Sequence, residues 1–233
     1  MKTISAKLSQ TFSLVAFVLF NTNSLASVMT NGTRVIYSSD ATGVSVTLNN
    51  TGQLPVLLQI WIDNGDIDAK PSSIKVPFVL TPPMSRIEPG KWQMLRIIYT
   101  GGKLPMDRES LFWLNTLEVP AKNHTKSDDN FLQIALRLRI KLFYRPAGLE
   151  GTANDAAKML TWNSKGTDLQ AVNSTPYHVS LVEVKVNGKK VKGEMIAPKT
   201  SRIFNLPGNT GHTITGVFIN DSGSIDKFES IIE

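Results

Sequence analysis

The stretch FLQIALRLRIKLFYRP, residues 131–146, has the pattern of one long β-strand. Successive side chains on a strand point to opposite faces. The aliphatic residues therefore form one stripe and the polar residues form the other: Leu132, Ile134, Leu136, Leu138, Ile140 and Leu142 against Gln133, Arg137, Arg139 and Lys141. The aliphatic face requires an apolar partner.

Two interpretations of this strand are open. It can be an internal strand of a β-sandwich, with its stripe in the protein's own core and its cations in water. Against this, it is longer than the usual five or six residues, and it follows a polar loop, residues 122–130, that keeps its start exposed. A long aliphatic edge strand is an aggregation hazard. A protein that keeps one is expected to use it for pairing with another chain.

Short alternating or β-branched segments recur along the chain, with turn residues between them. They are residues 44–48, 56–62, 75–80, 93–99 and 111–119 before the long strand, and 179–186, 189–196, 202–206 and 213–219 after it. The pair Asn187-Gly188 is a strong hairpin signal. Only residues 155–160 suggest a helical turn or two. The chain is therefore expected to be all-β.

The sequence Arg145-Pro146-Ala147-Gly148 interrupts the strand pattern. Proline lacks an N–H donor and restricts the residue before it, and glycine permits a sharp change of direction. We place a domain boundary here, with an N-terminal domain over residues 27–146 and a C-terminal β-sandwich domain over residues 147–233. Each has the size of an ordinary domain of roughly 100 residues.

The first 26 residues have the pattern of a secretory signal peptide. Lys2 and Lys7 precede an apolar run, residues 12–20, and Ser24-Leu25-Ala26 matches a signal peptidase site. This nine-residue run is too short to span a bilayer, which takes about 20 apolar residues in a helix. We expect cleavage after Ala26 and no membrane insertion of the mature chain.

Composition excludes several classes of function. The chain has no cysteine, which excludes thiolate metal sites and cysteine nucleophiles, so its cores must be stable without the disulfides that exported proteins often use. The net charge of +6 comes from cations interspersed with acids. Because they do not form a block, and because the chain is expected to be exported, nucleic acid is not an expected partner.

No cofactor, metal site or enzyme activity is expected. His124, His178 and His212 are far apart and lie in no metal-binding spacing, so we interpret them as surface residues. The acidic segment 63–68 departs from the D-x-D-x-D-G calcium pattern and is expected to form a turn. Phosphate-loop, nucleophile-elbow and zinc-protease motifs are absent from the sequence.

The chain resembles the periplasmic pilus chaperones of the chaperone-usher pathway. The motifs that carry this resemblance occur in family order: Thr33-Arg34-Val35-Ile36-Tyr37, Thr81-Pro82-Pro83, Asp107-Arg108-Glu109-Ser110-Leu111-Phe112, Leu132-Gln133-Ile134-Ala135-Leu136, Ile140-Lys141-Leu142-Phe143-Tyr144-Arg145-Pro146, Asn173-Ser174-Thr175-Pro176-Tyr177 and Ile219-Asn220-Asp221. The resemblance implies two immunoglobulin-like β-sandwich domains at an angle, with a cleft between them.

The resemblance also implies roles for individual residues. Arg34 and Lys141 would lie in the cleft and bind the C-terminal carboxylate of a pilus subunit, which suits arginine's forked donors and lysine's point charge. Strict alternation puts Lys141 and Leu136 on opposite faces, so we expect a bulge, a twist or a sheet switch between them. The remaining implied residues are the donor strand, Leu132, Ile134 and Leu136, and an interdomain salt-bridge network, Glu109, Arg145 and Asp221.

The implied function is that of a periplasmic chaperone. It would stabilise pilus subunits by donor-strand complementation, deliver them to an outer-membrane usher, and self-associate through its exposed edge when free. The alternative is a secreted two-domain β-sandwich adhesin or ligand-binding module, with the long strand internal. An exported hydrolase is a third class. Copurification separates them, because a chaperone is recovered with small subunits, an adhesin alone, and a hydrolase turns over a substrate.

Overall fold

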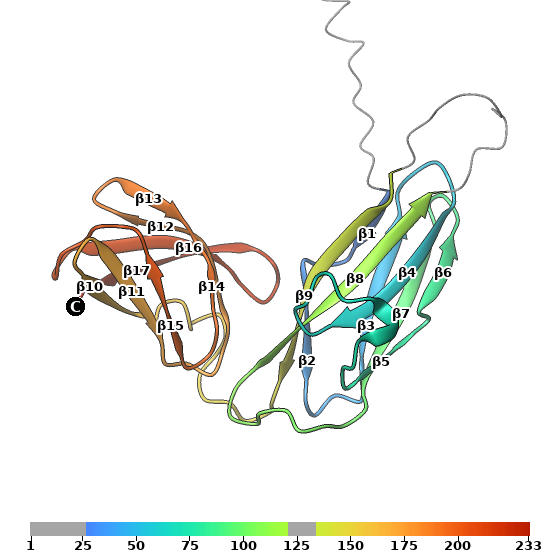
Figure 1. The fold of residues 1–233 in the computed structure, drawn as a ribbon, viewed down its shortest axis with the longest axis horizontal. Coiled ribbons are helices and arrows are strands. Elements are labelled where there is room, and N and C mark those ends of the chain that lie inside the picture. Colours follow the sequence, from blue (N-terminus) through green and yellow to red (C-terminus); the bar gives the residue numbers. More distant parts are fainter. Residues whose placement is uncertain (1–26, 121–133) are drawn as a thin grey trace, which may run out of the picture.

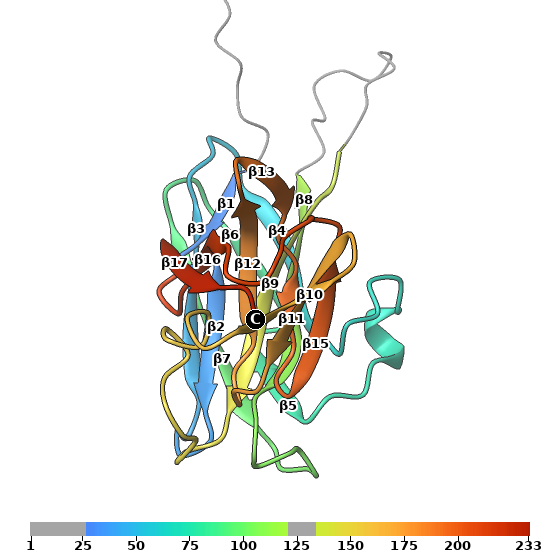
Figure 2. The same cartoon turned by 90° about the vertical axis from the view of Figure 1, so that its left-hand side faces the viewer.

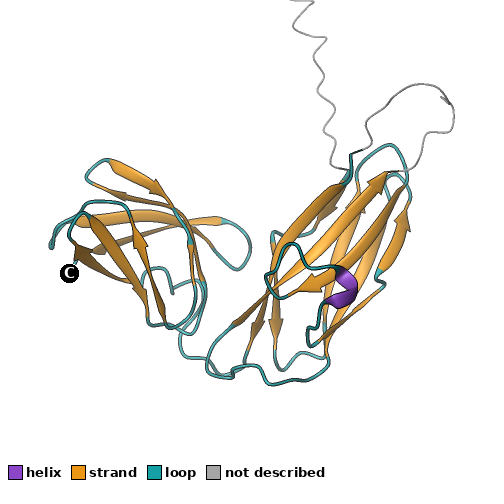
Figure 3. Ribbon diagram, viewed as in Figure 1, coloured by secondary structure: helices purple, strands orange, loops and turns teal. Residues whose placement is uncertain are grey.

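A computed structural model describes residues 27–120 and 134–233, and the expected all-β architecture is confirmed. The described residues form two β-sandwiches with one short 3-10 helix, η1 (Pro71–Ser73), as Figure 3 shows. The predicted signal peptide and Leu132 lie outside the described residues. Within the described part, no helix is long and apolar enough to cross a membrane.

The N-terminal domain consists of two packed sheets (Figure 1). The first has the order β1 (Val28–Thr30), β3 (Val44–Asn50), β7 (Trp92–Tyr99) and β5 (Phe78–Thr81). The second has the order β2 (Arg34–Ser38), β9 (Leu136–Arg145), β8 (Ser110–Pro120), β4 (Val56–Asp63) and β6 (Met84–Ile87). Every pairing in the two sheets is antiparallel except that of β2 with β9.

Alternation along the strands builds the N-terminal core. On β7, Leu95 and Ile97 are completely buried while Met94 and Arg96 face solvent, as the period of two predicts. At the end of the sandwich nearest the C-terminal domain, aromatic rings fill the space between the sheets. Their centroids lie 4.6–6.4 Å apart, and they are Tyr37, Phe78, Tyr99, Phe112 and Tyr144.

The C-terminal domain packs a three-stranded sheet on a five-stranded sheet. The smaller sheet has the order β10 (Thr161–Lys165), β11 (Asp168–Asn173) and β15 (Thr200–Phe204). The larger has the order β13 (Lys189–Lys192), β12 (Val179–Val186), β16 (Thr213–Ile219) and β17 (Ile225–Ile231), with β14 (Met195–Ile196) also paired to β12. Trp162 is fully buried between them and stacks on Phe228.

Six strands were not predicted from the sequence, namely β1, β2, β6, β10, β11 and β17. They are short or rich in polar residues, so their alternation is weak, and all of them except β11 lie at sheet edges, where one side needs no strand partner. The hairpin predicted at Asn187-Gly188 is present, with both residues at positive φ. Residues 153–159 form turns, which agrees with the short turn structure expected over residues 155–160.

Of the three alternatives expected between Leu136 and Lys141, the bulge and the sheet switch are wrong. β9 pairs with β8 in one unbroken antiparallel register from Leu136 to Tyr144. The two faces of β9 therefore remain distinct along its whole length. Leu138, Ile140 and Leu142 follow Leu136 on the face of the N-terminal core, while Lys141 lies on the opposite face, toward the C-terminal domain.

The two domains lie side by side at an angle, and the chain passes between them after β9 (Figure 1). Figure 2 views the molecule from the side of the C-terminal domain, which lies in front of the N-terminal sheets. The turn between β16 and β17 reaches the N-terminal domain, where a Cβ on Gly223 would lie 2.4 Å from the Thr33 hydroxyl. Glycine is required here for two reasons: a side chain would clash with Thr33, and the backbone φ of +86° is one that other residues rarely adopt.

The alternation on β7 generates a direct test of the core. Leu95→Ala should lower the free energy of unfolding by about 2–5 kcal/mol, because it removes a fully buried side chain and leaves a cavity. The adjacent exposed residue gives the control, and Met94→Ala should change it by about 0.5 kcal/mol or less. Chemical denaturation of both variants measures the difference, and equal losses would contradict the assignment of faces.

Candidate functional site

The strand β9 has one open edge. The parallel partner β2 covers only Lys141–Arg145 of β9, starting at the pair Arg34↔Lys141. Residues 136–140 pair with β8 on one side. On the other side they have no strand partner within the described ranges. Backbone donors and acceptors are therefore available there for a further strand.

The aliphatic stripe passes from solvent into the core beside this edge. Ile134 is 44% exposed and Leu138 is 38% exposed, whereas Leu136 is half-buried. Ile140 and Leu142 are buried in the N-terminal core. The apolar surface near the open edge is thus an extension of the protein's own core, as an unfilled part of a sandwich would be.

Arg34 and Lys141 are direct neighbours where the open edge ends. Arg34 Nη1 donates to the backbone oxygen of Ile219 at 3.0 Å, and Lys141 Nζ donates to Ser180 Oγ at 3.0 Å. In the described part of the chain neither cation forms an ion pair with a carboxylate. The Arg34 Nε atom is buried, and no described group accepts its hydrogen bond. This pair has unused capacity to bind an anion.

The electrostatics of the pair agree with that capacity. Burial and, second, the charge of Arg34 lower the pKa of Lys141 to about 8. Burial also lowers the pKa of Arg34, although the charges of Asp221 and Glu109 act in the opposite direction. A carboxylate placed between them would favour both charged forms.

Arg145 joins the two domains. Its guanidinium donates to Glu109 Oε1 at 2.7 Å and to both carboxylate oxygens of Asp221 at 2.6 and 2.8 Å. Although burial opposes its charge, the hydrogen bonds that Arg145 donates to Asp221 and the charge of Glu109 raise the pKa of Arg145. The other Glu109 oxygen accepts the backbone N–H of His178 at 2.8 Å. The interpretation of His178 as a surface residue is wrong, because its side chain is only 6% exposed at this junction.

A second ionic cluster holds the outer face of β9 on its own sheet, and sequence reasoning missed it. Asp63 is fully buried and accepts hydrogen bonds from Arg139 at 2.6 and 3.2 Å and from Asn115 at 2.7 Å. Arg137 donates twice to Asn115 Oδ1, and Arg139 lies over the Trp113 ring, 4.1 Å from its centroid. The sequence signal that could have revealed this cluster is an acidic residue at the end of one strand, Asp63, together with the alternating arginines Arg137 and Arg139 on another.

The acidic segment beginning at Asp63 behaves as predicted, because Asp63 Oδ1 accepts the N–H of Gly65 in a turn. Burial opposes ionisation of Asp63, but the hydrogen bonds from Arg139, Gly65 and Asn115 outweigh it and lower its pKa. Among the described residues no group of three or more potential metal-ligating side chains is found.

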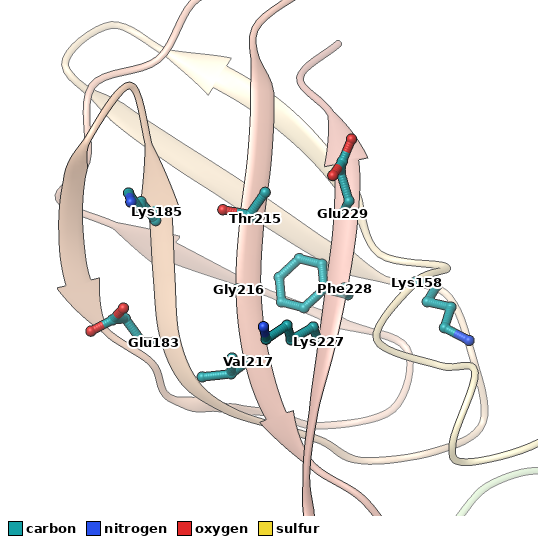
Figure 4. Close-up of a pocket in the computed structure, with 9 residues that line it drawn as sticks. All are labelled: Lys158, Glu183, Lys185, Thr215, Gly216, Val217, Lys227, Phe228 and Glu229. Atoms are coloured by element: carbon teal, nitrogen blue, oxygen red, sulfur yellow. The ribbon is translucent and has the colours of Figure 1, made fainter.

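A separate hollow of about 500 Å³ lies on the larger sheet of the C-terminal domain (Figure 4). Two rows of side chains cross it, in register across β12, β16 and β17. They are Lys185, Thr215 and Glu229, and Glu183, Val217 and Lys227. Its lining includes neither Arg34 nor Lys141. A different, narrow hollow between the domains is lined in part by Arg34. The wider hollow is therefore not part of the candidate site.

The fold and site define a two-domain β-sandwich protein with an open strand edge that ends at a cation pair. Residues 27–150 match the family described as pili and flagellar-assembly chaperone, PapD N-terminal domain. Residues 155–230 match the family described as pili assembly chaperone PapD, C-terminal domain. The chain belongs to the pili assembly chaperone family.

Relatives and solved structures agree along nearly the whole chain. The chaperone protein FimB/FhaD of Bordetella pertussis is 43% identical over 216 residues, covering 89% of this chain and 88% of that protein. The probable fimbrial chaperone YadV of Escherichia coli is 42% identical, covering 84% and 85%. The structure of the Salmonella enterica SafA pilin in complex with the SafB chaperone matches with a TM-score of 0.78 and 33% identity, covering 90% of this chain and 98% of that one.

The site generates a prediction about Lys141. Its folded-state pKa of about 8 is below the ordinary value of 10.5, so the unfolded state binds more protons between these values and stability rises with pH across that window. At pH 7 the charged amine is destabilising. Lys141→Met should raise the free energy of unfolding by about 1–2 kcal/mol, a figure reduced for the amine's remaining contact with water.

Denaturation at pH 7 and pH 10 measures this effect. The difference in the free energy of unfolding between Lys141→Met and the parent protein should be smaller at pH 10. Lys227→Met, on the distant sheet of Figure 4, is the control and should show no such dependence. A variant less stable than the parent at pH 7 would contradict the prediction.

The Asp63 cluster generates another prediction. Asp63→Asn should lower the free energy of unfolding by about 2–3 kcal/mol, below the full cost of breaking a buried pair because Arg139 retains some solvent contact. The loss should be present above pH 4 and vanish as pH falls through the lowered folded-state pKa, because Asp63 stabilises only when ionised. Glu88→Gln, in the exposed pair with Arg86, should cost less than about 1 kcal/mol.

Proposed function

We propose that this chain is a periplasmic chaperone that binds pilus subunits by donating β9 and delivers them to an outer-membrane usher. Family membership supports this, and two relatives are named as probable fimbrial chaperones. The predicted signal peptide supports export to the periplasm. The named complex of SafA pilin with SafB chaperone shows that a related protein binds a pilin.

The observation that carries the proposal is the point at which β2 begins. β2 occupies the edge of β9 only from Lys141 onward, so an added strand can occupy residues 134–140 until it meets Arg34. The edge therefore has a fixed end, and two cations stand at that end. A strand added there is directed toward an anion-binding group.

The position of the cations also selects the direction of the added strand. A strand parallel to β9 would run as β2 does, and its C-terminus would reach Arg34 and Lys141. An antiparallel strand would bring its C-terminus to the other end of the edge, beside Ile134. Because a chain-terminal carboxylate is an anion that arginine and lysine bind strongly, parallel addition is the favoured mode.

The aliphatic stripe would supply the apolar part of the interaction. Leu132, Ile134 and Leu136 would enter the groove of a subunit whose sandwich lacks one strand. Each aliphatic side chain that becomes fully buried contributes about 1.5–3 kcal/mol. Burial and backbone pairing would supply the free energy of capture, so no nucleotide is needed. At the usher, another subunit's strand would replace β9.

The alternative function, a secreted adhesin or ligand-binding module, is not favoured. That interpretation required the long strand to be internal, whereas residues 136–140 have an open edge within the described ranges. The relatives are named as chaperones, and none of those given above is named as an adhesin.

Capture tests the assigned anchor. Arg34→Ala or Lys141→Ala should reduce recovery of chaperone-subunit complex from periplasmic extract by at least about thirtyfold, because truncating one partner of a desolvated charge pair costs about 2–5 kcal/mol. Lys227→Ala is the matched control and should leave the yield unchanged. Circular dichroism and the unfolding midpoint show whether each variant is folded. Normal yields from both folded anchor variants would exclude the anchor.

A further inference from the structure

Glu118 is a buried carboxylate whose hydrogen-bond partners are the first residues that the structure describes. Its side chain is 9% exposed, and it accepts the Ser27 hydroxyl at 2.5 Å. Its second oxygen lies 3.3 Å from the backbone nitrogens of both Ser27 and Val28. A buried carboxylate requires compensation by donors or by a positive charge.

The surroundings of Ser27 fit this residue closely. Its backbone oxygen accepts hydrogen bonds from the Thr51 N–H at 2.7 Å and from the Thr51 hydroxyl at 3.0 Å. Gly52 leaves space for it, because a Cβ on Gly52 would lie 2.6 Å from the Ser27 Cβ. Every polar group of Ser27 therefore has a partner, and its nitrogen points to a carboxylate.

Ser27 follows Ala26, the last residue of the predicted signal peptide. Cleavage there converts the Ser27 backbone amide into an α-ammonium group, with one positive charge and three donors. We propose that Glu118 is the binding site for this new N-terminus, so that processing creates an ion pair inside the end of the sandwich. The inference rests on the proposed export, since it requires the cleaved chain.

The position of this pair links it to the donor strand. Glu118 lies directly opposite Leu136 in the β8–β9 ladder, while Ser27 leads into β1 of the other sheet. The pair therefore connects the two sheets at the end of the sandwich from which the donor segment extends. Removal of the signal peptide would therefore form an ion pair beside the donor strand at the time when the chain leaves the membrane.

A purely structural role for Glu118, as an acceptor for the start of β1, would not depend on the charge of the terminus. The experiment therefore varies the terminus and the carboxylate together. Four chains are compared: beginning at Ser27 or with one alanine before it, each with Glu118 or with Glu118→Gln. A cleavable fusion leaves the desired first residue, which mass spectrometry verifies, and the unfolding equilibrium is measured for each chain.

The added alanine should reduce the folding equilibrium constant about tenfold when Glu118 is present, as expected for loss of a partly buried charge-assisted hydrogen bond. With Glu118→Gln the effect should be less than about twofold, within the range of ordinary surface changes. Equal effects in the two backgrounds, or no effect with Glu118, would overturn the proposal.

The parent chain provides a measurement that needs no variant. The pKa of the Ser27 α-amino group, determined by NMR titration, should exceed the ordinary value of about 7.7–8.0, because Glu118 is the ionisable group that contacts it. An ordinary or lowered value would overturn the ion pair. No client is present in these assays, and mass spectrometry of the exported chain tests cleavage separately, so failure here is distinct from failure of the proposed chaperone function.

Discussion

The parallel pairing of β2 with β9 begins at Arg34 and Lys141, and the rest of the site depends on that starting point. If β2 began earlier in the chain, it would cover residues 136–140 of β9. If it began later, Arg34 would no longer lie directly beside Lys141. The pairing leaves residues 136–140 with an open edge and brings two cations together at its end. In the proposed function, this one backbone feature would determine the location, the direction and the C-terminal end of an added strand.

Contacts at the junction between the domains hold Arg34 and Lys141 side by side, although burial disfavours their charged forms. Burial lowers the pKa of both cations, although the charges of Asp221 and Glu109 act in the opposite direction on Arg34. Their contacts, Ile219 and Ser180, belong to the C-terminal domain. Arg145 joins that domain to the N-terminal domain through Glu109 and Asp221, so this ionic network positions the groups that contact Arg34 and Lys141. Binding capacity and stability oppose each other here.

Much of the fold was predictable from the sequence, because alternation survives along long strands such as β9 and a hairpin signal such as Asn187-Gly188 is local. Short polar strands such as β10 and β17 were not predicted. The resemblance identified Arg34 and Lys141, but the absence of an ion pair with a carboxylate in the described part of the chain depends on how the domains meet. The pairings of Asp63 with Arg139 and of Glu118 with Ser27 join residues 76 and 91 positions apart, which no local pattern reveals.

The central claim is that a chain-terminal carboxylate is bound where the open edge of β9 ends. The most direct measurement compares the affinity of the chaperone for two forms of a subunit's last strand, one with a free C-terminal carboxylate and one with a C-terminal amide, by calorimetry. We predict that amidation weakens binding by at least about thirtyfold, the effect of removing about 2 kcal/mol or more of a desolvated charge interaction. Equal affinities for the acid and the amide would contradict the claim.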